Sequence, residues 1–225
     1  MAKYAKSWND KLNNYFIKLK LYFKNNWKYI LINYLIFLIV FLILFIIDFA
    51  AKETLFVFDD GSKSFNGSTR GEFDVDSSKY TNFILFGIRS VGHVGVTFLP
   101  TKNIVFIQVL SIIFLLISIF CVLFTKNIFI TVGLGIVAAG DFGNMLDRFL
   151  YNGMVKDILY IPWMDLGTFN FADIWLSLGC LFILFVTIFE IIQDKRRNKL
   201  LKNEGENDSF KNKNNQTYNN NLKMS

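Results

Sequence analysis

Four long runs of apolar residues constrain this chain more than any other feature. Each run has roughly the 20 residues that an α-helix needs to cross the hydrocarbon core of a bilayer. Hydrophobic residues make up 53% of the 225 residues, which is more apolar surface than a soluble domain of this size can bury. The sequence therefore predicts an α-helical integral membrane protein with four transmembrane helices, at residues 29–47, 104–124, 128–146 and 171–192.

The polar ends of the chain predict two further parts. Residues 1–28 carry seven Lys residues interleaved with aromatic ones, a composition typical of an amphipathic helix on a lipid surface. Residues 194–225 are rich in Lys and Asn and predict a basic, disordered tail. The four-span domain is then expected over residues 29–193.

The longest polar loop, residues 48–103, follows the first apolar run. It contains six Gly residues and two short patches, residues 82–88 and 91–99, that are typical of strands separated by turns. The loop predicts a small antiparallel β-sheet that rests on the membrane outside the cytoplasm.

The distribution of Lys and Arg predicts the orientation. Both termini are basic and the short connection at 125–127 carries Lys126, so the positive-inside rule places all three in the cytoplasm. Residues 48–103 and 147–170 then face outward. The net charge of +6 is concentrated beside the apolar runs, which indicates membrane lipids and not nucleic acid as partners.

The chain offers little for a disulfide or a metal site. Cys121 and Cys180 both lie within apolar runs, where they are expected to be small buried side chains. There is a single His, and no set of His and Cys has the spacing of metal ligands. No metal or other cofactor is therefore expected.

Polar residues are costly inside or beside transmembrane helices, so their positions indicate function. They gather at the outer ends of the third and fourth runs and in the connection between them, at Asn144, Asp147, Arg148, Asp157, Asn170 and Asp173. All of them can meet at one depth near the outer membrane surface. Two carboxyl groups held within hydrogen-bonding distance share a proton, and such a pair can hydrolyse a peptide bond by activating water.

The residues alone leave other roles open. Asp147 and Arg148 equally suit a structural ion pair or a headgroup anchor, and Asp157 taken singly is an ordinary loop acid. Asn170 is a good N-cap residue, which places Asp173 in the first turn of the fourth helix. The helix dipole there favours the ionised form of Asp173.

Three segments of this region resemble, in the same order, the motifs of the lipoprotein signal peptidases (signal peptidase II). They are Gly143-Asn144-Met145-Leu146-Asp147-Arg148, Val155-Lys156-Asp157 and Phe169-Asn170-Phe171-Ala172-Asp173. The resemblance extends over residues 29–192 and leaves out both polar ends.

The resemblance implies a membrane aspartyl endopeptidase of the bacterial cell membrane. Such an enzyme removes signal peptides from diacylglyceryl-modified prolipoproteins and cleaves before the lipid-bearing cysteine. We expect this chain to function as a monomer. The catalytic pair falls on Asp157 and Asp173. The residues that position the substrate fall on Asn144, Arg148 and Asn170, and Asp147 falls on a structural support. The loop at 48–103 is similar to the family's β-cradle, which clasps the peptide above the membrane.

Two motifs of the family are altered here. Asp48 and Lys52 match the family's D-x-x-T-K motif, in which Ala51 replaces Thr. Both residues are further candidates for positioning the substrate. His93 stands where the N-x-G-x-x-F motif has Asn. It either keeps the hydrogen-bonding role of that Asn or is an exposed loop residue.

Two other features are additions to the family pattern. Asp141 is an extra acid in the third apolar run, three residues before Asn144. It either pairs with Arg148 or faces an aqueous cavity. The outer loop is also long enough to contain an extra hairpin around residues 59–76.

Two other classes of protein compete with a protease. A small ion or proton-coupled transporter would place carboxylates near the bilayer midplane, between broken helices. A non-catalytic membrane scaffold would have no need for two acids within these motifs. The predicted position of Asp157 and Asp173 at the ends of the spans favours chemistry at the membrane surface.

Overall fold

The structure is a computed structural model of the chain. It describes residues 2–58, 61, 73–74, 80–95, 103–164 and 167–222, with side chains for all of these except 2–10, 73–74 and 202–222. The chain divides into two compact units, Met1–Leu181 and Phe182–Ser225, and everything that builds the site belongs to the first.

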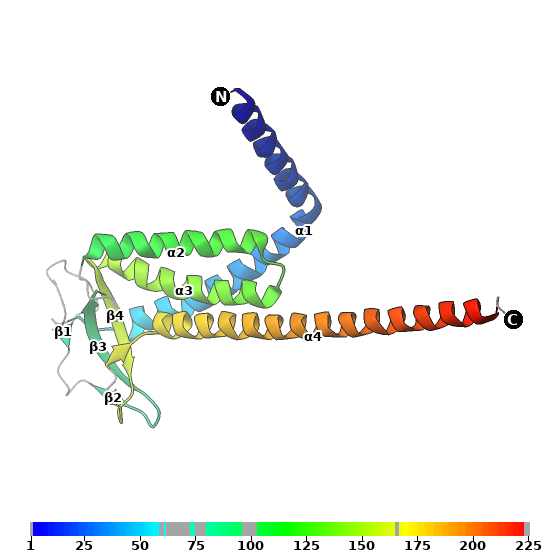
Figure 1. The fold of residues 1–225 in the computed structure, drawn as a ribbon. Coiled ribbons are helices and arrows are strands. Elements are labelled where there is room, and N and C mark those ends of the chain that lie inside the picture. The colour runs from blue at the N-terminus through cyan, green and yellow to red at the C-terminus, as the bar shows by residue number, and fades with distance from the viewer. Residues whose placement is uncertain are drawn as a thin grey trace. The chain divides into compact units, whose positions relative to one another are not determined.

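Four α-helices contain the apolar runs (Figure 1). They are α1 (Ala2–Leu55), α2 (Ile104–Phe124), α3 (Ile128–Leu150) and α4 (Phe171–Leu222). Within the described residues, these four helices are long and apolar enough to cross a membrane. The predicted four-span helical fold is confirmed.

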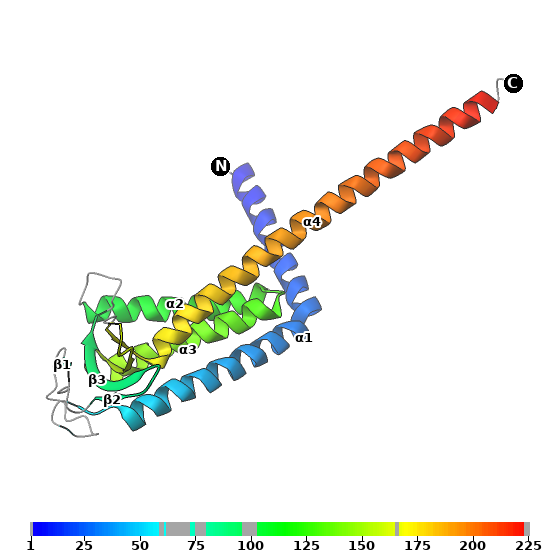
Figure 2. The same cartoon turned by 90° about the horizontal axis from the view of Figure 1, so that it is seen from below.

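The helix α3 is the central one of the first unit, where it packs against α1 and α2 (Figure 2). Half of the residues in its most apolar window are buried, against 11% for α1 and 22% for α2. Small residues on α3 explain the difference, because Gly and Ala let neighbouring backbones approach closely. The large apolar side chains of α1 and α2 are left exposed, as lipid contact requires.

The first helix extends beyond the predicted boundaries at both ends. Residues 2–28 belong to α1 and do not form a separate helix, and α1 continues to Leu55. Asp48 and Lys52 therefore lie in the last turns of a helix and not in a loop. They are tolerated there because they form an i,i+4 ion pair of 2.8 Å that is almost fully buried.

The ends of the other helices also differ from the prediction. α3 ends at Leu150 and not at residue 146, which keeps Asp147 and Arg148 within the helix. α4 continues to Leu222, where a disordered tail was expected from residue 194. The tail contains no Pro, the residue that would interrupt a helix, although its many Asn residues have a low helix propensity.

A five-stranded antiparallel sheet completes the first unit, which confirms the predicted small sheet. Its strands are β1 (Phe73–Asp74), β2 (Thr81–Asn82), β3 (Gly87–Val94), β4 (Met154–Tyr160) and β5 (Thr168–Phe169). The order is β1-β3-β4-β5, and β2 also pairs with β3. The strand β4 comes from the connection between the third and fourth runs, where the sequence analysis predicted no strand.

The two predicted strand patches have different outcomes. The patch 82–88 is interrupted by a turn, in which the backbone N–H of Phe83 donates to the carbonyl oxygen of Phe86 over 2.8 Å. Residues 91–94 of the second patch belong to β3, which begins at Gly87 and ends at Val94. Residues 96–99 and most of the expected hairpin at 59–76 lie outside the described residues.

Two apolar clusters hold the first unit together. Phe37, Val122 and Ala138 join α1, α2 and α3 in the membrane region. Phe56, Phe58, Met154, Ile158 and Leu159 join the segment after α1 to β4. The two cysteines contribute to neither cluster, because Cys121 and Cys180 are free and exposed, contrary to the expectation that they are buried.

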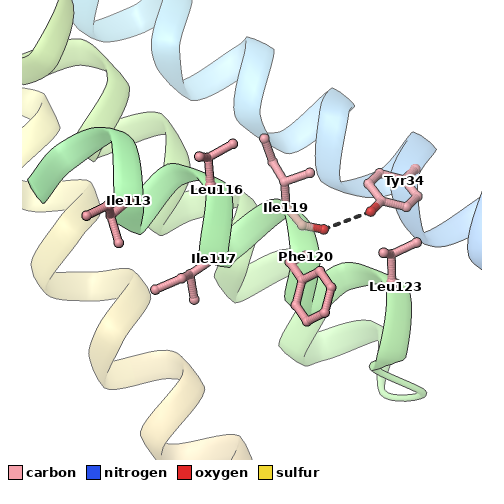
Figure 3. Close-up of a pocket in the computed structure, with 7 residues that line it drawn as sticks. All are labelled: Tyr34, Ile113, Leu116, Ile117, Ile119, Phe120 and Leu123. Atoms are coloured by element: carbon pink, nitrogen blue, oxygen red, sulfur yellow. Dashed lines mark hydrogen bonds between the residues drawn. The ribbon is translucent and has the colours of Figure 1, made fainter. Parts of the chain in front are cut away.

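One apolar groove lies on the outside of the helices, between α1 and α2 (Figure 3). It is lined by Tyr34 and by six Ile, Leu and Phe side chains of α2. The Tyr34 hydroxyl donates to the carbonyl oxygen of Ile119 over 2.8 Å. With no charged side chain in its wall, the groove suits an acyl chain of a lipid and not a reaction.

Candidate active site

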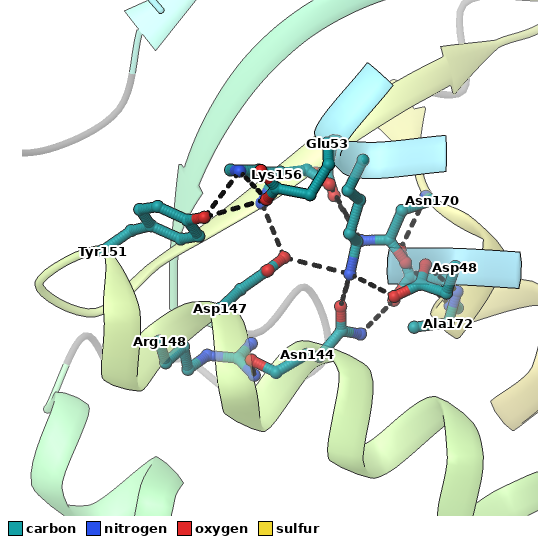
Figure 4. A network of polar contacts seen from close by, with 12 residues as sticks. Asp48, Glu53, Asn144, Asp147, Arg148, Tyr151, Lys156, Asn170 and Ala172 are labelled. Atoms are coloured by element: carbon teal, nitrogen blue, oxygen red, sulfur yellow. Dashed lines mark hydrogen bonds and ion pairs between the residues drawn. The ribbon is translucent and has the colours of Figure 1, made fainter. Parts of the chain in front are cut away.

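The polar residues of four elements meet where the helices adjoin the sheet (Figure 4). Asn144 and Asp147 project from α3 toward Asp48 at the end of α1, with Lys156 of β4 and Asn170 beside them. The predicted convergence is therefore observed, and it includes both Asp157 and Asp173.

Asp173 is held by the start of α4. Its backbone N–H donates to Oδ1 of Asn170 over 3.0 Å, and its Oδ2 accepts from the backbone N–H of Asn170 over 3.1 Å. This reciprocal pair is a capping box, with Asn170 as N-cap and Asp173 at N3, as the sequence predicts. Asp173 therefore lies in the first turn of α4, at the positive end of the helix dipole.

Asn170 links the two carboxyl groups. It is fully buried, and its Nδ2 lies 2.8 Å from Oδ1 of Asp157 and 3.0 Å from Oδ1 of Asn144. A third acceptor, the carbonyl oxygen of Lys156, lies at 3.3 Å. The same residue therefore contacts Asp157 through its side chain and Asp173 through its backbone.

Asn144 makes a second link from α3. Its Nδ2 donates to Oδ1 of Asp173 over 2.8 Å. Its Oδ1 accepts from Asn170 and from Nζ of Lys52, the latter over 3.2 Å. The carboxylate of Asp173 thus accepts two hydrogen bonds, one from the side chain of Asn144 and one from the backbone of Asn170.

Asp157 has a different environment on β4. Its side chain is only 6% exposed, and burial raises the pKa of this carboxyl well above its usual value. The negative charge of Asp173 raises the pKa of Asp157 further, whereas Lys52 and the hydrogen bond from Asn170 oppose the shift. Asp157 and Asp173 therefore have different surroundings.

A buried ion-pair network supports these residues from behind. Nζ of Lys52 lies 2.8 Å from Asp48 and 3.0 Å from Asp147, and Lys52 and Asp48 are each 1% exposed. Asp48 Oδ1 accepts from the backbone N–H of Ala172, and Asp147 Oδ2 accepts from that of Lys156. The network therefore ties α1 and α3 to both segments that carry the acids.

This burial changes the roles expected for three residues. Asp48 and Lys52 have no surface for contact with a substrate and do not line the cavity, so they support the site. Asp147 pairs with Lys52 and β4 and not with Arg148. The guanidinium of Arg148 instead donates to the carbonyl oxygens of Asn144, over 3.2 Å, and Gly95, over 2.8 Å.

Lys156 is a site residue that the sequence analysis missed. Its Nζ lies 2.6 Å from Oε1 of Glu53 and 2.7 Å from the hydroxyl of Tyr151. The same ammonium group lies over the rings of Tyr151, Phe56 and Phe58. Burial and the neighbouring Glu53 raise the pKa of the Tyr151 phenol, which donates to Glu53. The only sign of this role in the sequence was a Lys placed directly between Val155 and Asp157.

The strand register determines which side chains face the site. His93 pairs with Val155 and Val91 pairs with Asp157 across β3 and β4. Opposed residues of an antiparallel pair lie on one face, and residues two apart share it. His93, Val155 and Asp157 therefore face one way, and Lys156 faces the other.

A cavity of about 720 Å³ opens in front of the two acids. Its wall includes Asp157, Asp173, Asn144, Arg148 and His93, and apolar residues of α2 and α4 extend it into the membrane region. His93 belongs to a strand, so it is not a loop residue, and its buried Nε2 has no hydrogen-bond partner in the described structure. Asp141 also lines the cavity and forms no ion pair with Arg148 among the described contacts, which favours the cavity alternative.

The arrangement provides two acids in different surroundings at the wall of a cavity that also contains Asn144, Arg148 and His93. Two carboxyl groups in unlike surroundings, joined through one amide, are suited to general acid–base catalysis with a water molecule. Among the described residues, no group of three or more His, Cys, Asp or Glu side chains has the arrangement of a metal site.

Comparison with known families decides what kind of protein carries this site. The family model described as signal peptidase (SPase) II matches residues 39–189, which contain every residue of the site. The chain belongs to the signal peptidase II family. Its four spanning helices and its sheet are therefore features of a membrane-embedded bacterial peptidase family.

Individual relatives align over shorter segments. The lipoprotein signal peptidase of Wigglesworthia glossinidia brevipalpis is 33% identical over 86 residues, which are 35% of this chain and 56% of that protein. That of Fusobacterium nucleatum subsp. nucleatum is 31% identical over 131 residues, 49% of this chain and 79% of that protein. The chain thus spans little more than half the length of the first of these relatives.

Two solved structures share the fold. A bacterial membrane enzyme determined by the in meso method at 2.3 Å resolution has a TM-score of 0.55 and 20% identity, covering 69% of this chain and 88% of that one. A second, at 1.9 Å resolution, has a TM-score of 0.50 and 21% identity, covering 67% and 91%. At this identity the likeness concerns the fold alone.

Proposed function

We propose that this family member is an aspartyl endopeptidase that removes signal peptides from diacylglyceryl-modified prolipoproteins, cutting before the lipidated cysteine. The observation that carries the proposal is the joint binding of Asp157 and Asp173 by Asn170, at the wall of the large cavity. The names of the relatives support the substrate class.

The mechanism follows from the unequal environments of the two acids. Asp173 is ionised and takes a proton from water, whose oxygen attacks the scissile carbonyl carbon. Asp157 is protonated and passes its proton to the carbonyl oxygen, which gives a gem-diol intermediate. Asp173 then transfers its proton to the leaving nitrogen as the C–N bond breaks, and Asp157 recovers a proton from the gem-diol. No covalent bond to the enzyme forms.

Other residues of the site hold the substrate and the acids. Asn144 and Asn170 keep the acids in place, and Arg148, with its unpartnered Nε, is directed at the polar part of the substrate. The apolar wall from α2 and α4 accommodates the signal peptide and acyl chains. His93 provides an additional hydrogen-bonding group where the family motif has Asn.

We place the enzyme in the bacterial cell membrane as a functional monomer, with both termini in the cytoplasm. The sheet and the two acids then face outward, where the cleavage site of a translocated precursor lies. The rival transporter is disfavoured because Asp157 lies on β4 and Asp173 in the first turn of α4, at the end of a span and not at its middle.

The test is cleavage of a synthetic diacylglyceryl prolipopeptide by the purified full chain in detergent. We expect the parent to cut it and to leave the unmodified precursor intact. Asp157→Asn and Asp173→Asn should each reduce kcat by at least about 10³-fold, because each acid handles a proton in both steps. Asp194→Asn is the matched control, since it makes the same chemical change at an exposed position of α4 far along the chain from the site.

Either of two results contradicts the proposal. Cleavage at the parental rate by Asp157→Asn or Asp173→Asn would eliminate the two-acid mechanism. Failure of the parent to cut the lipidated peptide, in a preparation that is folded by its melting transition, would eliminate the activity itself.

A further inference from the structure

The apolar groove between α1 and α2 is separate from the substrate cavity (Figure 3). On α2 the cavity is lined by a set of residues that includes Ile107 and Phe114, whereas the groove is lined by a set that includes Ile113 and Phe120. The second set is displaced by six residues along the chain, which is about 120° around a helix. The groove therefore lies on another face of α2, and the two-acid mechanism gives it no role.

The groove has the length of one leaflet of a bilayer. The helix α2 contains 21 residues and is about 31 Å long, close to the thickness of the hydrocarbon core. The groove begins at Ile113, near the middle of α2, and ends at Leu123, in its last turn. This stretch corresponds to about 15 Å, or half of the core. An occupant of the groove therefore lies in the leaflet next to the turn between α2 and α3.

The wall of the groove suits an acyl chain. Six of its seven lining side chains are Ile, Leu or Phe, and its volume is about 510 Å³, within the range of small-ligand pockets. The Tyr34 hydroxyl, the polar group among these side chains, already donates to the carbonyl oxygen of Ile119. A fatty acyl chain is the apolar ligand that a membrane supplies at this depth.

Two lysines lie at the end of the groove where the headgroup of such a lipid is expected. Leu123 is three residues before Lys126, which lies in the turn between α2 and α3. The hydroxyl of Tyr29 donates to the carbonyl oxygen of Lys126, and this contact brings Lys28, the preceding residue, to the level of the turn. Lys28 and Lys126 are exposed, and neither forms an ion pair with another described residue.

No acid balances these charges nearby in the chain. Residues 11–47 and 101–140, which contain both lysines and every residue of the groove, include no Asp or Glu. An uncompensated basic site next to the membrane attracts anionic lipid headgroups. Trp27, which is 56% exposed beside Lys28, is a side chain typical of the same interface.

We infer that the groove between α1 and α2 binds an anionic phospholipid, with one acyl chain along Ile113–Leu123 and the phosphate at Lys28 and Lys126. This lipid is a ligand of the enzyme and not its substrate. The assignment to the cytoplasmic leaflet rests on the proposed orientation, whereas the binding does not depend on the peptidase activity.

The experiment measures lipid binding to the purified full chain in a non-ionic detergent by native mass spectrometry. Phosphatidylglycerol, which is anionic, is compared with phosphatidylcholine, which is zwitterionic and carries the same acyl chains. We expect one phosphatidylglycerol per chain, bound at least about tenfold more tightly than phosphatidylcholine. The ratio should fall to about one in the double variant Lys28→Gln and Lys126→Gln. The double variant Lys195→Gln and Lys199→Gln is the matched control, because these exposed lysines belong to α4, which contributes no residue to the groove.

A second variant tests the groove itself. Leu116→Trp places a larger side chain in the wall and should weaken binding of both lipids by about tenfold, the effect of two methylene groups that lose their contacts. Leu116 is 60% exposed, so we expect the variant to fold, and its melting transition checks this.

Several outcomes overturn the inference. Equal affinities of the parent for the two lipids do so, as does a preference that survives the loss of Lys28 and Lys126. Unchanged binding in Leu116→Trp removes the lipid from the groove. A dimer of the parent that Leu116→Trp dissociates assigns the groove to a second copy of the chain. A chain that binds phosphatidylglycerol selectively but cuts no lipopeptide overturns the proposed function and leaves this inference intact.

Discussion

At the scale of single residues, the hydrogen bonds from Asn170 and Asn144 give the two acids different surroundings. Neutral amides can bind a carboxylate through Nδ2 without adding a charge of their own. Asp173 receives hydrogen bonds from Asn144 and from the backbone of Asn170, whereas Asp157 is buried with a single one from Asn170. The asymmetry lies in the surroundings and not in the acids, which are chemically identical.

The raised pKa of Asp157 predicts a stability that depends on pH. A carboxyl whose pKa is higher in the folded than in the unfolded state stabilises the fold at low pH, and this stability is lost as the pH rises from the unfolded towards the folded pKa. Asp157→Asn removes that loss, since an amide does not ionise. We therefore expect the variant to be inactive but more stable than the parent at pH 7, by about 1 kcal/mol or more.

The measurement is the melting temperature of both proteins in detergent from pH 4 to pH 8. The difference should grow with pH over the lower part of this range. A difference that stays constant across the range would show that burial of the Asp157 carboxyl has no such effect.

At the scale of elements, the site depends on how closely α3 approaches the start of α4. A Cβ at Gly140 would lie 2.4 Å from the carbonyl oxygen of Ala172, and one at Gly143 would lie 2.6 Å from Oδ2 of Asp48. Gly140 leaves room for the backbone of Ala172, between Asn170 and Asp173, and Gly143 leaves room for the carboxylate of Asp48. Close packing therefore explains why glycine is present at position 143, within the motif, and at position 140.

Gly140→Ala is predicted to separate α3 from the first turn of α4. Backbone atoms cannot rotate away as a side-chain end can, so Asp173 must move relative to Asn144. We expect a loss of cleavage of about 10²-fold and a destabilisation of about 1–3 kcal/mol. Gly135→Ala is the control on the same helix, where the nearest atom lies 3.1 Å away, and its effect on cleavage should be small. Equal rates for the two variants would contradict this account of the close approach.

At the scale of the whole molecule, the orientation in the membrane determines on which side of it the two acids lie. The two acids and the sheet lie at one end of α2 and α3, and Lys126 lies at the other, in the turn between these helices. In the orientation that we propose from the positive-inside rule, Lys126 lies in the cytoplasm and the acids lie outside.

Cysteine labelling in intact cells tests this orientation. Single cysteines at Ile84, which is 91% exposed in the turn before β3, and at Lys126 should react with a membrane-impermeant maleimide from opposite sides. Cys121 and Cys180 are replaced by Ser beforehand. We expect Ile84→Cys to react in intact cells and Lys126→Cys only after permeabilisation, and the reverse pattern would invert the topology.

The sequence alone determined the class of fold and indicated most of the polar residues that meet at the site. Twenty apolar residues in a row have few alternatives to a spanning helix, because an unpaired backbone is too costly in lipid. The N-cap role of Asn170 and the position of Asp173 in the first turn could also be predicted from the sequence, since they depend on residues only three apart in the chain. The motifs identified Asp157 as a partner of Asp173, which periodicity could not do.

Only the tertiary structure decided how these residues act together. The strand β4, the Lys156 site with Glu53 and Tyr151, and the buried pair of Asp48 and Lys52 depend on contacts between segments far apart in sequence. Local sequence patterns contain no information on contacts between distant segments. The charges of Asp48 and Lys52 therefore suggested that a loop begins at residue 48, whereas their burial as an ion pair lets α1 continue to Leu55. The difference between Asp157 and Asp173 has the same origin, because burial and neighbouring charge come from the packing of α1, α3, β4 and α4 around them.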